Sequence, residues 1–201
     1  MAGTLIAASL AGIRVFATGG IGGVHRDAPY DVSADLPELA RQPVLVVCAG
    51  AKAILDLRAT VEYLETAGVP IIGYQTPEFP AFYARRSGLP VDAMVDTPAE
   101  VVEIALRHWE MGLRSAVLVV QPPPEDVALN EDEMEGIIQQ ALEDARQFGV
   151  RGSAVTPYLL ARVSQLSGGE SLRANLALLR SNVRLGAAIA AHLPRKDARS
   201  I

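Results

Sequence analysis

The chain lacks several features that would place it in a specialised class of protein. Its single cysteine, Cys48, excludes an intrachain disulfide and fits a reducing cytoplasm. A formal net charge of -5 argues against a nucleic-acid-binding surface, which needs clustered basic residues. No run of roughly 18 apolar residues is present, so no membrane span is expected, and the apolar N-terminus has no basic region typical of a signal peptide. The sequence therefore predicts a cytoplasmic protein that binds neither nucleic acid nor membrane.

Lysine is also scarce. Of the 18 lysine and arginine residues, only Lys52 and Lys196 are lysines, and Lys196 lies in a polar tail where it needs no special role. An amine, unlike a guanidinium, can act as a nucleophile when it is partly desolvated. Lys52 follows a buried-strand pattern, and ligands of open α/β sheets bind beyond the carboxyl ends of the strands. We therefore favour a catalytic Lys52 over a surface lysine whose stem lies along apolar surface.

Strand-like and helix-like patterns alternate along most of the chain. Apolar runs bounded by turn residues predict strands at residues 13–18, 43–48, 69–74, 91–95 and 115–120. Periodic segments with capping and stop residues predict helices at 1–12, 33–41, 53–67, 97–111, 130–148, 156–167 and 170–192. The sequence thus predicts one domain, residues 1–201, with an α/β fold of layered α/β/α type, a mainly parallel sheet and a helical C-terminal tail.

A glycine-rich loop at residues 19–26 follows the first predicted strand. It does not match the dinucleotide-binding fingerprint, because His25 occupies the third glycine position. A loop this rich in glycine can still bring backbone N–H groups against a phosphate. A tight structural turn is an equally good interpretation.

Oxygen-bearing side chains follow at Asp31, Ser33 and Asp35. Carboxylates suit Mg²⁺ or Mn²⁺ better than Zn²⁺, which prefers histidine and cysteine. Asp35 could equally be a first-turn residue of a short helix, favoured by the helix dipole, with Ser33 as its N-cap. The spacing by itself leaves both interpretations open.

The last predicted helix carries an apolar stripe at Leu172, Leu176, Leu179 and Val183. Asn175 lies on the same face, and Asn182 follows one heptad later. A buried asparagine must be hydrogen-bonded, either to another helix or to a ligand in a cleft that this helix faces. At the end of an earlier helix, His108 and Trp109 are expected to cap or to pack, and Cys48 is expected to be an inert core residue.

Several long motifs together resemble the pseudouridine-5'-phosphate glycosidase family, also called indigoidine synthase A-like. The most specific ones are residues 16–26, 31–36 and 48–52, and further matches lie at 63–66, 73–76, 156–162 and 168–172. The likeness covers nearly the whole chain.

The resemblance implies reversible cleavage of the carbon–carbon glycosidic bond of pseudouridine 5'-phosphate, which gives uracil and ribose 5-phosphate. Lys52 would be the nucleophile that forms an imine with C1' of the opened ribose. Asp31 would hold a divalent metal, usually manganese, through bound water. The substrate would be contacted by Ser33, Ala34, Asp35, His25 and Asn175. A homotrimer is also implied.

Two departures from the family pattern keep alternatives open. Family members are longer, and this chain begins about a third of the way in, without the glutamate acid/base and a substrate-binding lysine. The loop between His25 and Asp31 is also slightly shorter than usual. One alternative is a catalytically incomplete chain that binds a phosphosugar or associates with other subunits. Another keeps the fold but acts on a different C-nucleoside phosphate or a pigment precursor.

Overall fold

The computed structural model describes residues 1–26 and 28–194, so Lys196 lies outside the described residues. Its centre is a five-stranded sheet in the order β1-β4-β8-β6-β7. The strands are β1 (Val15–Ala17), β4 (Leu45–Cys48), β8 (Val117–Val120), β6 (Ile71–Tyr74) and β7 (Ala93–Val95). Every neighbouring pair is parallel, as the continuous apolar runs predict.

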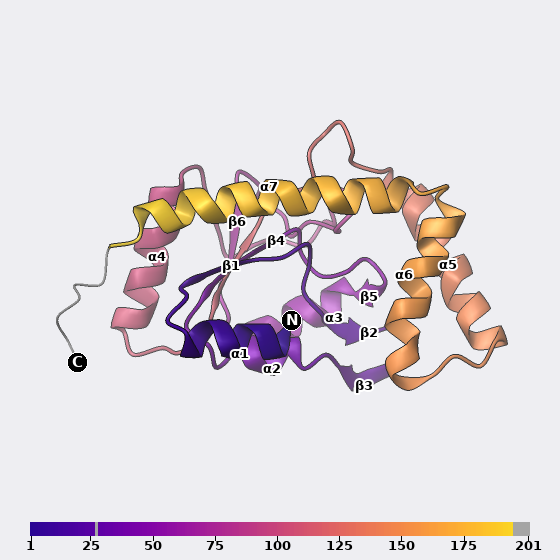
Figure 1. Ribbon diagram of the computed structural model, residues 1–201, viewed down its shortest axis with the longest axis horizontal. Helices are drawn as coiled ribbons and strands as arrows, with labels where there is room; N and C mark the ends of the chain where they lie inside the picture. Colours follow the sequence, from indigo (N-terminus) through magenta and orange to yellow (C-terminus); the bar gives the residue numbers. More distant parts are fainter. Residues whose placement is uncertain (27, 195–201) are drawn as a thin grey trace.

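Helices cover both faces of this sheet, so the predicted three-layer α/β fold is confirmed. On one face, α4 (Pro98–Glu110) and α7 (Glu170–His192) pack on side chains such as Leu45 and Val117. On the other face, Val46 and Leu118 pack against α1 (Ala2–Leu10), α2 (Asp35–Leu39) and α3 (Leu57–Thr66). Figure 1 shows α7 along most of the length of the molecule, with α1 and α2 across the sheet from it. Successive residues of a strand point to opposite faces of the sheet, so their side chains pack alternately into the two cores.

A second, three-stranded antiparallel sheet was missed by the sequence prediction. It has the order β3-β2-β5 and consists of β2 (Val24–His25), β3 (Ala28–Val32) and β5 (Leu55–Asp56). These strands are too short for a clear alternating pattern. The predicted helix at 53–67 therefore begins later, at Leu57, because residues 55–56 pair with β2 and Asp56 caps the helix by accepting from Ala59 N.

The N-termini of α4 and α5 lie where the capping residues predict them. Thr97 and Glu100 form the predicted capping box of α4, and Asn130 caps α5 (Glu131–Gln147) by accepting from Glu133 N at 3.0 Å. A 3₁₀ turn at Gly152–Ala154 precedes α6 (Val155–Leu166). The short helix α2 begins at Asp35, and the Ser33 hydroxyl accepts from Asp35 N without being the N-cap residue.

The buried face of α7 is not the face with the apolar stripe. Leu172, Leu176, Leu179 and Val183 are 54%, 51%, 38% and 50% exposed. The buried residues are instead Ser171, Ala174, Leu178, Asn182, Leu185, Gly186 and Ile189. A methyl group at Gly186 would lie 3.3 Å from Ala17 Cβ, so the helix turns its small residues toward the sheet in order to approach it closely.

No helix in the described part of the chain is long and apolar enough to cross a membrane.

Candidate functional site

The glycine loop and the segment that carries Lys52 form one backbone ladder that continues the pairing of β1 with β4. Ala49 N donates to Gly19 O at 2.9 Å, Ile21 N donates to Gly50 O at 3.0 Å, and Lys52 N donates to Ile21 O at 3.0 Å. Both segments leave the carboxyl ends of neighbouring parallel strands, where α/β sheets bind ligands. The ladder therefore places Lys52 directly beside the glycine loop.

A cavity of about 280 Å³ lies between this ladder and helices α6 and α7. Its lining comprises Ala17, Thr18, Gly19, Gly20, Lys52, Phe82, Leu160, Asn175 and Leu179. The Lys52 side chain is partly exposed. Asn175 lies against the glycine loop, since a methyl group at Gly19 would lie 3.0 Å from Asn175 Oδ1. Of the residues predicted for the site, the structure brings Lys52 and Asn175 together here.

Phe82 supplies the aromatic wall of the cavity, and sequence reasoning gave it no role. Its backbone has a φ of 64°, a strained conformation for a bulky residue. The ring lies against the glycine loop, because a methyl group at Gly20 would come within 2.5 Å of Phe82 Cε2. Nearby, Gly50 has a φ of 89°, and a methyl group there would meet Pro80 O at 2.3 Å. Both glycines thus permit the close packing that encloses this wall of the cavity.

Asn182 is hydrogen-bonded to the sheet and not to another helix, which was one of the two alternatives that the sequence left open. Its side chain is fully buried, and Nδ2 donates to Thr18 O at 2.8 Å and to Gly19 O at 3.3 Å. Its Oδ1 accepts from Gln121 Nε2 at 2.8 Å, and Gln121 follows the end of β8. The heptad spacing singled out Asn182 in the sequence, whereas nothing there singled out Gln121.

Asp35 and Ser33 hold the far side of the glycine loop. The buried Asp35 carboxylate accepts from Gly22 N and from Ala2 N, both at 2.8 Å. The backbone N–H of Ser33 donates to Gly23 O at 3.0 Å. Both oxygens of Asp35 are therefore engaged by backbone in this arrangement. Neither residue lines the Lys52 cavity, and substrate contact by Ser33, Asp35 and the exposed Ala34 stays a prediction.

Asp31 and His25 lie on the small antiparallel sheet, on β3 and β2 respectively. Asp31 is exposed, and its carboxylate has no hydrogen-bond or ion-pair partner among the described residues. No group of three or more metal-binding side chains occurs in the described ranges. One exposed carboxylate fits a hard cation that keeps most of its water, and it does not fit a cage of protein ligands. The partly exposed His25 does not line the Lys52 cavity either.

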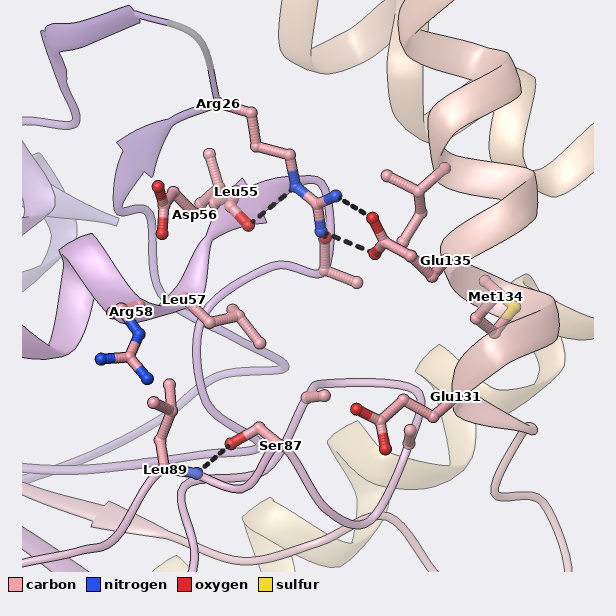
Figure 2. Close-up of a pocket in the computed structure, with 14 residues that line it drawn as sticks. Arg26, Leu55, Asp56, Leu57, Arg58, Ser87, Leu89, Glu131, Met134 and Glu135 are labelled. Carbon is pink, nitrogen blue, oxygen red and sulfur yellow. Dashed lines mark hydrogen bonds and ion pairs between the residues drawn. The ribbon is translucent and has the colours of Figure 1, made fainter.

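Arg26 braces the backbone that follows Lys52. Its guanidinium donates to Ala53 O at 2.9 Å and to Leu55 O at 3.1 Å, and it forms a double hydrogen bond with Glu135 of α5. Burial by itself would raise the pKa of Glu135, but the hydrogen bonds from Arg26 and Gln139 outweigh it and hold the pKa below its usual value. Figure 2 shows this pair at the rim of a second cavity of about 470 Å³ between α3 and α5. Through these hydrogen bonds, Arg26 connects the segment after Lys52 to α5, which is distant in the sequence.

Cys48, His108 and Trp109 lie near the sheet and contribute to packing and hydrogen bonding. Burial raises the pKa of the Cys48 thiol to about 12, so it stays protonated and inert, as expected. Trp109 Nε1 donates to Ser115 O at 3.0 Å, and His108 Nε2 lies 2.8 Å from Ser115 Oγ. His108 and Trp109 therefore pack and hydrogen-bond at the end of α4, as the sequence predicts.

The family model described as Indigoidine synthase A like protein matches residues 1–192. A pseudouridine-5'-phosphate glycosidase of Solibacter usitatus is 53% identical over 195 residues, which are 96% of this chain and 65% of the relative. One of Caldanaerobacter subterraneus is 53% identical over 192 residues, 94% of this chain and 62% of the relative. The chain thus spans less than two thirds of the length of these curated relatives.

Two solved structures share the fold. An indigoidine synthase A-like protein of Thermotoga maritima has a TM-score of 0.87 and 39% identity, covering 93% of this chain and 62% of the other. The prealnumycin C-glycosynthase AlnA, solved in complex with ribulose 5-phosphate, has a TM-score of 0.86 and 41% identity, covering 94% and 64%. The family model, these relatives and the motifs around Lys52 all agree, and the chain therefore belongs to the indigoidine synthase A-like family.

Proposed function

We propose that this chain is a pseudouridine-5'-phosphate glycosidase, a carbon–carbon lyase of nucleoside catabolism that acts through an imine on Lys52. The observation that carries the proposal is the cavity in which Lys52, the glycine loop and Asn175 meet at the carboxyl end of the parallel sheet. Relatives named pseudouridine-5'-phosphate glycosidase and a C-glycosynthase bound to ribulose 5-phosphate support a phosphosugar as the substrate. Glycines at this strand end let backbone approach a phosphate closely.

The proposed reaction begins with an amine and the carbonyl carbon of an opened sugar, which together form an imine. Lys52 Nζ, unprotonated, attacks C1' of open-chain ribose 5-phosphate, and loss of water gives an imine. In the synthetic direction, the uracil carbon adds to C1' and loses its proton, and the imine electron pair returns to nitrogen. The sugar O4' then closes on C1' as the lysine nitrogen leaves. Cleavage is the reverse, with the electron pair of the carbon–carbon bond returning to the uracil carbon. In this proposal Asn175, which lines the same cavity as Lys52, orients the sugar.

We propose that Asp31 holds a divalent cation such as Mn²⁺. Its exposed carboxylate fits a largely hydrated metal ion. The bound cation would supply positive charge that a phosphate-bearing substrate can bind. Measurement of Mn²⁺ binding by isothermal titration to the wild type and to Asp31→Asn tests this proposal, which fails if both bind equally.

Reductive trapping tests the role of Lys52. The protein is incubated with ribose 5-phosphate and sodium borohydride, which reduces an imine to a stable adduct, and peptide mass spectrometry locates the added mass. With Lys52 and Lys196 as the only lysines, the second lysine serves as an internal control. We expect the adduct on Lys52 and its loss in Lys52→Arg, which keeps the charge but cannot form an imine. An unmodified Lys52, or equal labelling of Lys196, contradicts the proposal.

A second candidate function is phosphosugar binding or subunit association without carbon–carbon bond cleavage. The observation that favours it is the cavity lining, where none of the described residues carries a carboxyl group for proton transfer. A measurement of pseudouridine 5'-phosphate turnover by this chain distinguishes the glycosidase function from the binding function. Trapping together with release of uracil supports the glycosidase, whereas trapping with no uracil release supports the binding function.

We further propose, from the family likeness, a cytoplasmic homotrimer. Light scattering coupled to size-exclusion chromatography measures the mass in solution, and a monomer at all concentrations would refute the trimer.

A further inference from the structure

A buried amide pair, Gln121 and Asn182, joins α7 to the sheet beside the Lys52 cavity. Asn182 Nδ2 donates to Thr18 O and Gly19 O at 2.8 and 3.3 Å, and its Oδ1 accepts from Gln121 Nε2 at 2.8 Å. The backbone N–H of Gln121 donates to Cys48 O at 3.1 Å. The pair thus contacts β1, β4 and β8 at the carboxyl end of each strand.

The contact with Gly19 extends to Lys52 through successive backbone hydrogen bonds. Gly19 O, which accepts from the amide pair, also accepts from Ala49 N at 2.9 Å. The next rungs of the same ladder join Ile21 N to Gly50 O and Lys52 N to Ile21 O, each at 3.0 Å. One backbone ladder therefore connects Gly19, which the amide pair contacts, to Lys52.

The other wall of the cavity lies on α7 itself. Asn175 and Leu179 line the cavity, and Asn182 lies two helical turns beyond Asn175 on the same helix. Asn182 is hydrogen-bonded to the ladder, and Asn175 of the same helix lines the cavity with Lys52. A contact that fixes α7 against the ladder therefore bears on the separation between Asn175 and Lys52. Reacting groups must be held at near-contact distance, and a small displacement slows the reaction strongly.

We propose that Gln121 and Asn182 are positioning residues for the reaction at Lys52. Neither residue lines the cavity, and they act by fixing the Lys52 ladder against α7. This inference rests on the proposed imine chemistry, but its statement about the ladder can be tested without that chemistry. A general stabilising role would instead affect the whole fold and leave the chemistry of the folded protein unchanged.

The kinetic test compares Asn182→Leu and Gln121→Met with Asn130→Ala. The first two remove the amides while keeping a side chain of similar size, and the third removes a helix cap on α5. We expect the maximal rate of borohydride trapping with ribose 5-phosphate, per folded protein, to fall at least about tenfold in the first two variants and to stay within about twofold in the third. The half-saturating sugar concentration should change less than about threefold, because every side chain that lines the cavity is retained.

Hydrogen–deuterium exchange of the same variants provides the independent measurement. Loss of the amide pair should speed exchange in peptides spanning residues 19–21 and 49–52, with peptides of α5 unchanged. Unaltered exchange in those peptides, or wild-type trapping rates in both variants, overturns the inference. A wild type that forms no adduct refutes the imine chemistry instead, and the exchange measurement then decides whether the pair holds the ladder.

Discussion

Individual residues around the glycine loop show how little free space the site contains. Gly22 is packed so closely that a methyl group there would lie 2.1 Å from Ser33 Oγ and 2.9 Å from Asp35 Oδ2. Its N–H also donates to Asp35. Position 22 therefore requires glycine for a steric reason, which does not depend on contact with a phosphate.

Gly22→Ala should consequently destabilise the protein. We expect a loss of roughly 1–3 kcal/mol in the free energy of unfolding, because the methyl group must displace Ser33 or Asp35. Urea unfolding measures it. The matched control is Gly136→Ala in α5, where a methyl group meets nothing within 4 Å and should stabilise by about 0.5–1 kcal/mol. Equal effects of the two substitutions would contradict this account.

At the scale of the residue, protonation of His108 makes the free energy of unfolding depend on pH. Burial lowers its pKa below the usual 6.5. Its partner Ser115 Oγ donates to Gly68 O at 2.6 Å, so the imidazole Nε2 donates to Ser115 Oγ. The folded protein thus binds the proton less readily than the unfolded chain. The free energy of unfolding is therefore highest above pH 6.5 and falls as the pH drops toward the folded-state pKa.

Thermal unfolding between about pH 7 and pH 5 checks this dependence. The wild type should lose more stability over this interval than His108→Gln, which has no titrating group. The carboxyl groups whose pKa values are lowered, such as Asp144 beside Arg162, titrate further down and do not interfere. Parallel pH curves for the two proteins would show that His108 is not the cause.

At the scale of the element, α7 shows that apolar spacing alone does not identify a buried face. Leu178 is fully buried, whereas Leu176 is 51% exposed, although both belong to regular helical patterns. The buried face combines Leu178 and Ile189 with the small or polar residues Ala174, Gly186 and Asn182. Close approach to the sheet and the hydrogen bonds of Asn182 determine the orientation of this helix.

Leu178→Ala and Leu176→Ala test this orientation. The first should lower the free energy of unfolding by roughly 2–5 kcal/mol, because it leaves a cavity in the core. The second should change it by no more than about 0.5 kcal/mol, since the side chain is half exposed. Denaturant titration measures both, and a larger cost at Leu176 than at Leu178 would mean that α7 is rotated.

At the scale of the whole molecule, the central sheet separates two cores that the same strands build. Leu45 and Val47 pack under α4 and α7, while Val46 and Cys48 pack toward α1, α2 and α3. The Lys52 cavity opens beyond the carboxyl end of these strands, where α6 and α7 meet the ladder. The site therefore depends on segments from both ends of the chain.

Local features of the sequence determined most of the elements. Five apolar runs became the five parallel strands, and Thr97 and Asn130 capped helices where their side chains predicted. The scarcity of lysine singled out Lys52, and the motifs around it identified the family. These inferences succeed because backbone hydrogen bonding, capping and burial in a parallel sheet depend on near neighbours.

Only the tertiary structure decided which residues share the cavity. It placed Asn175 and Lys52 in the lining of one cavity, and it paired Asn182 with Gln121. It turned both oxygens of Asp35 toward backbone N–H groups. It also formed the small antiparallel sheet and exposed the stripe on α7. These arrangements depend on contacts between residues far apart in the sequence, whose geometry follows from how helices and strands pack and not from any local pattern.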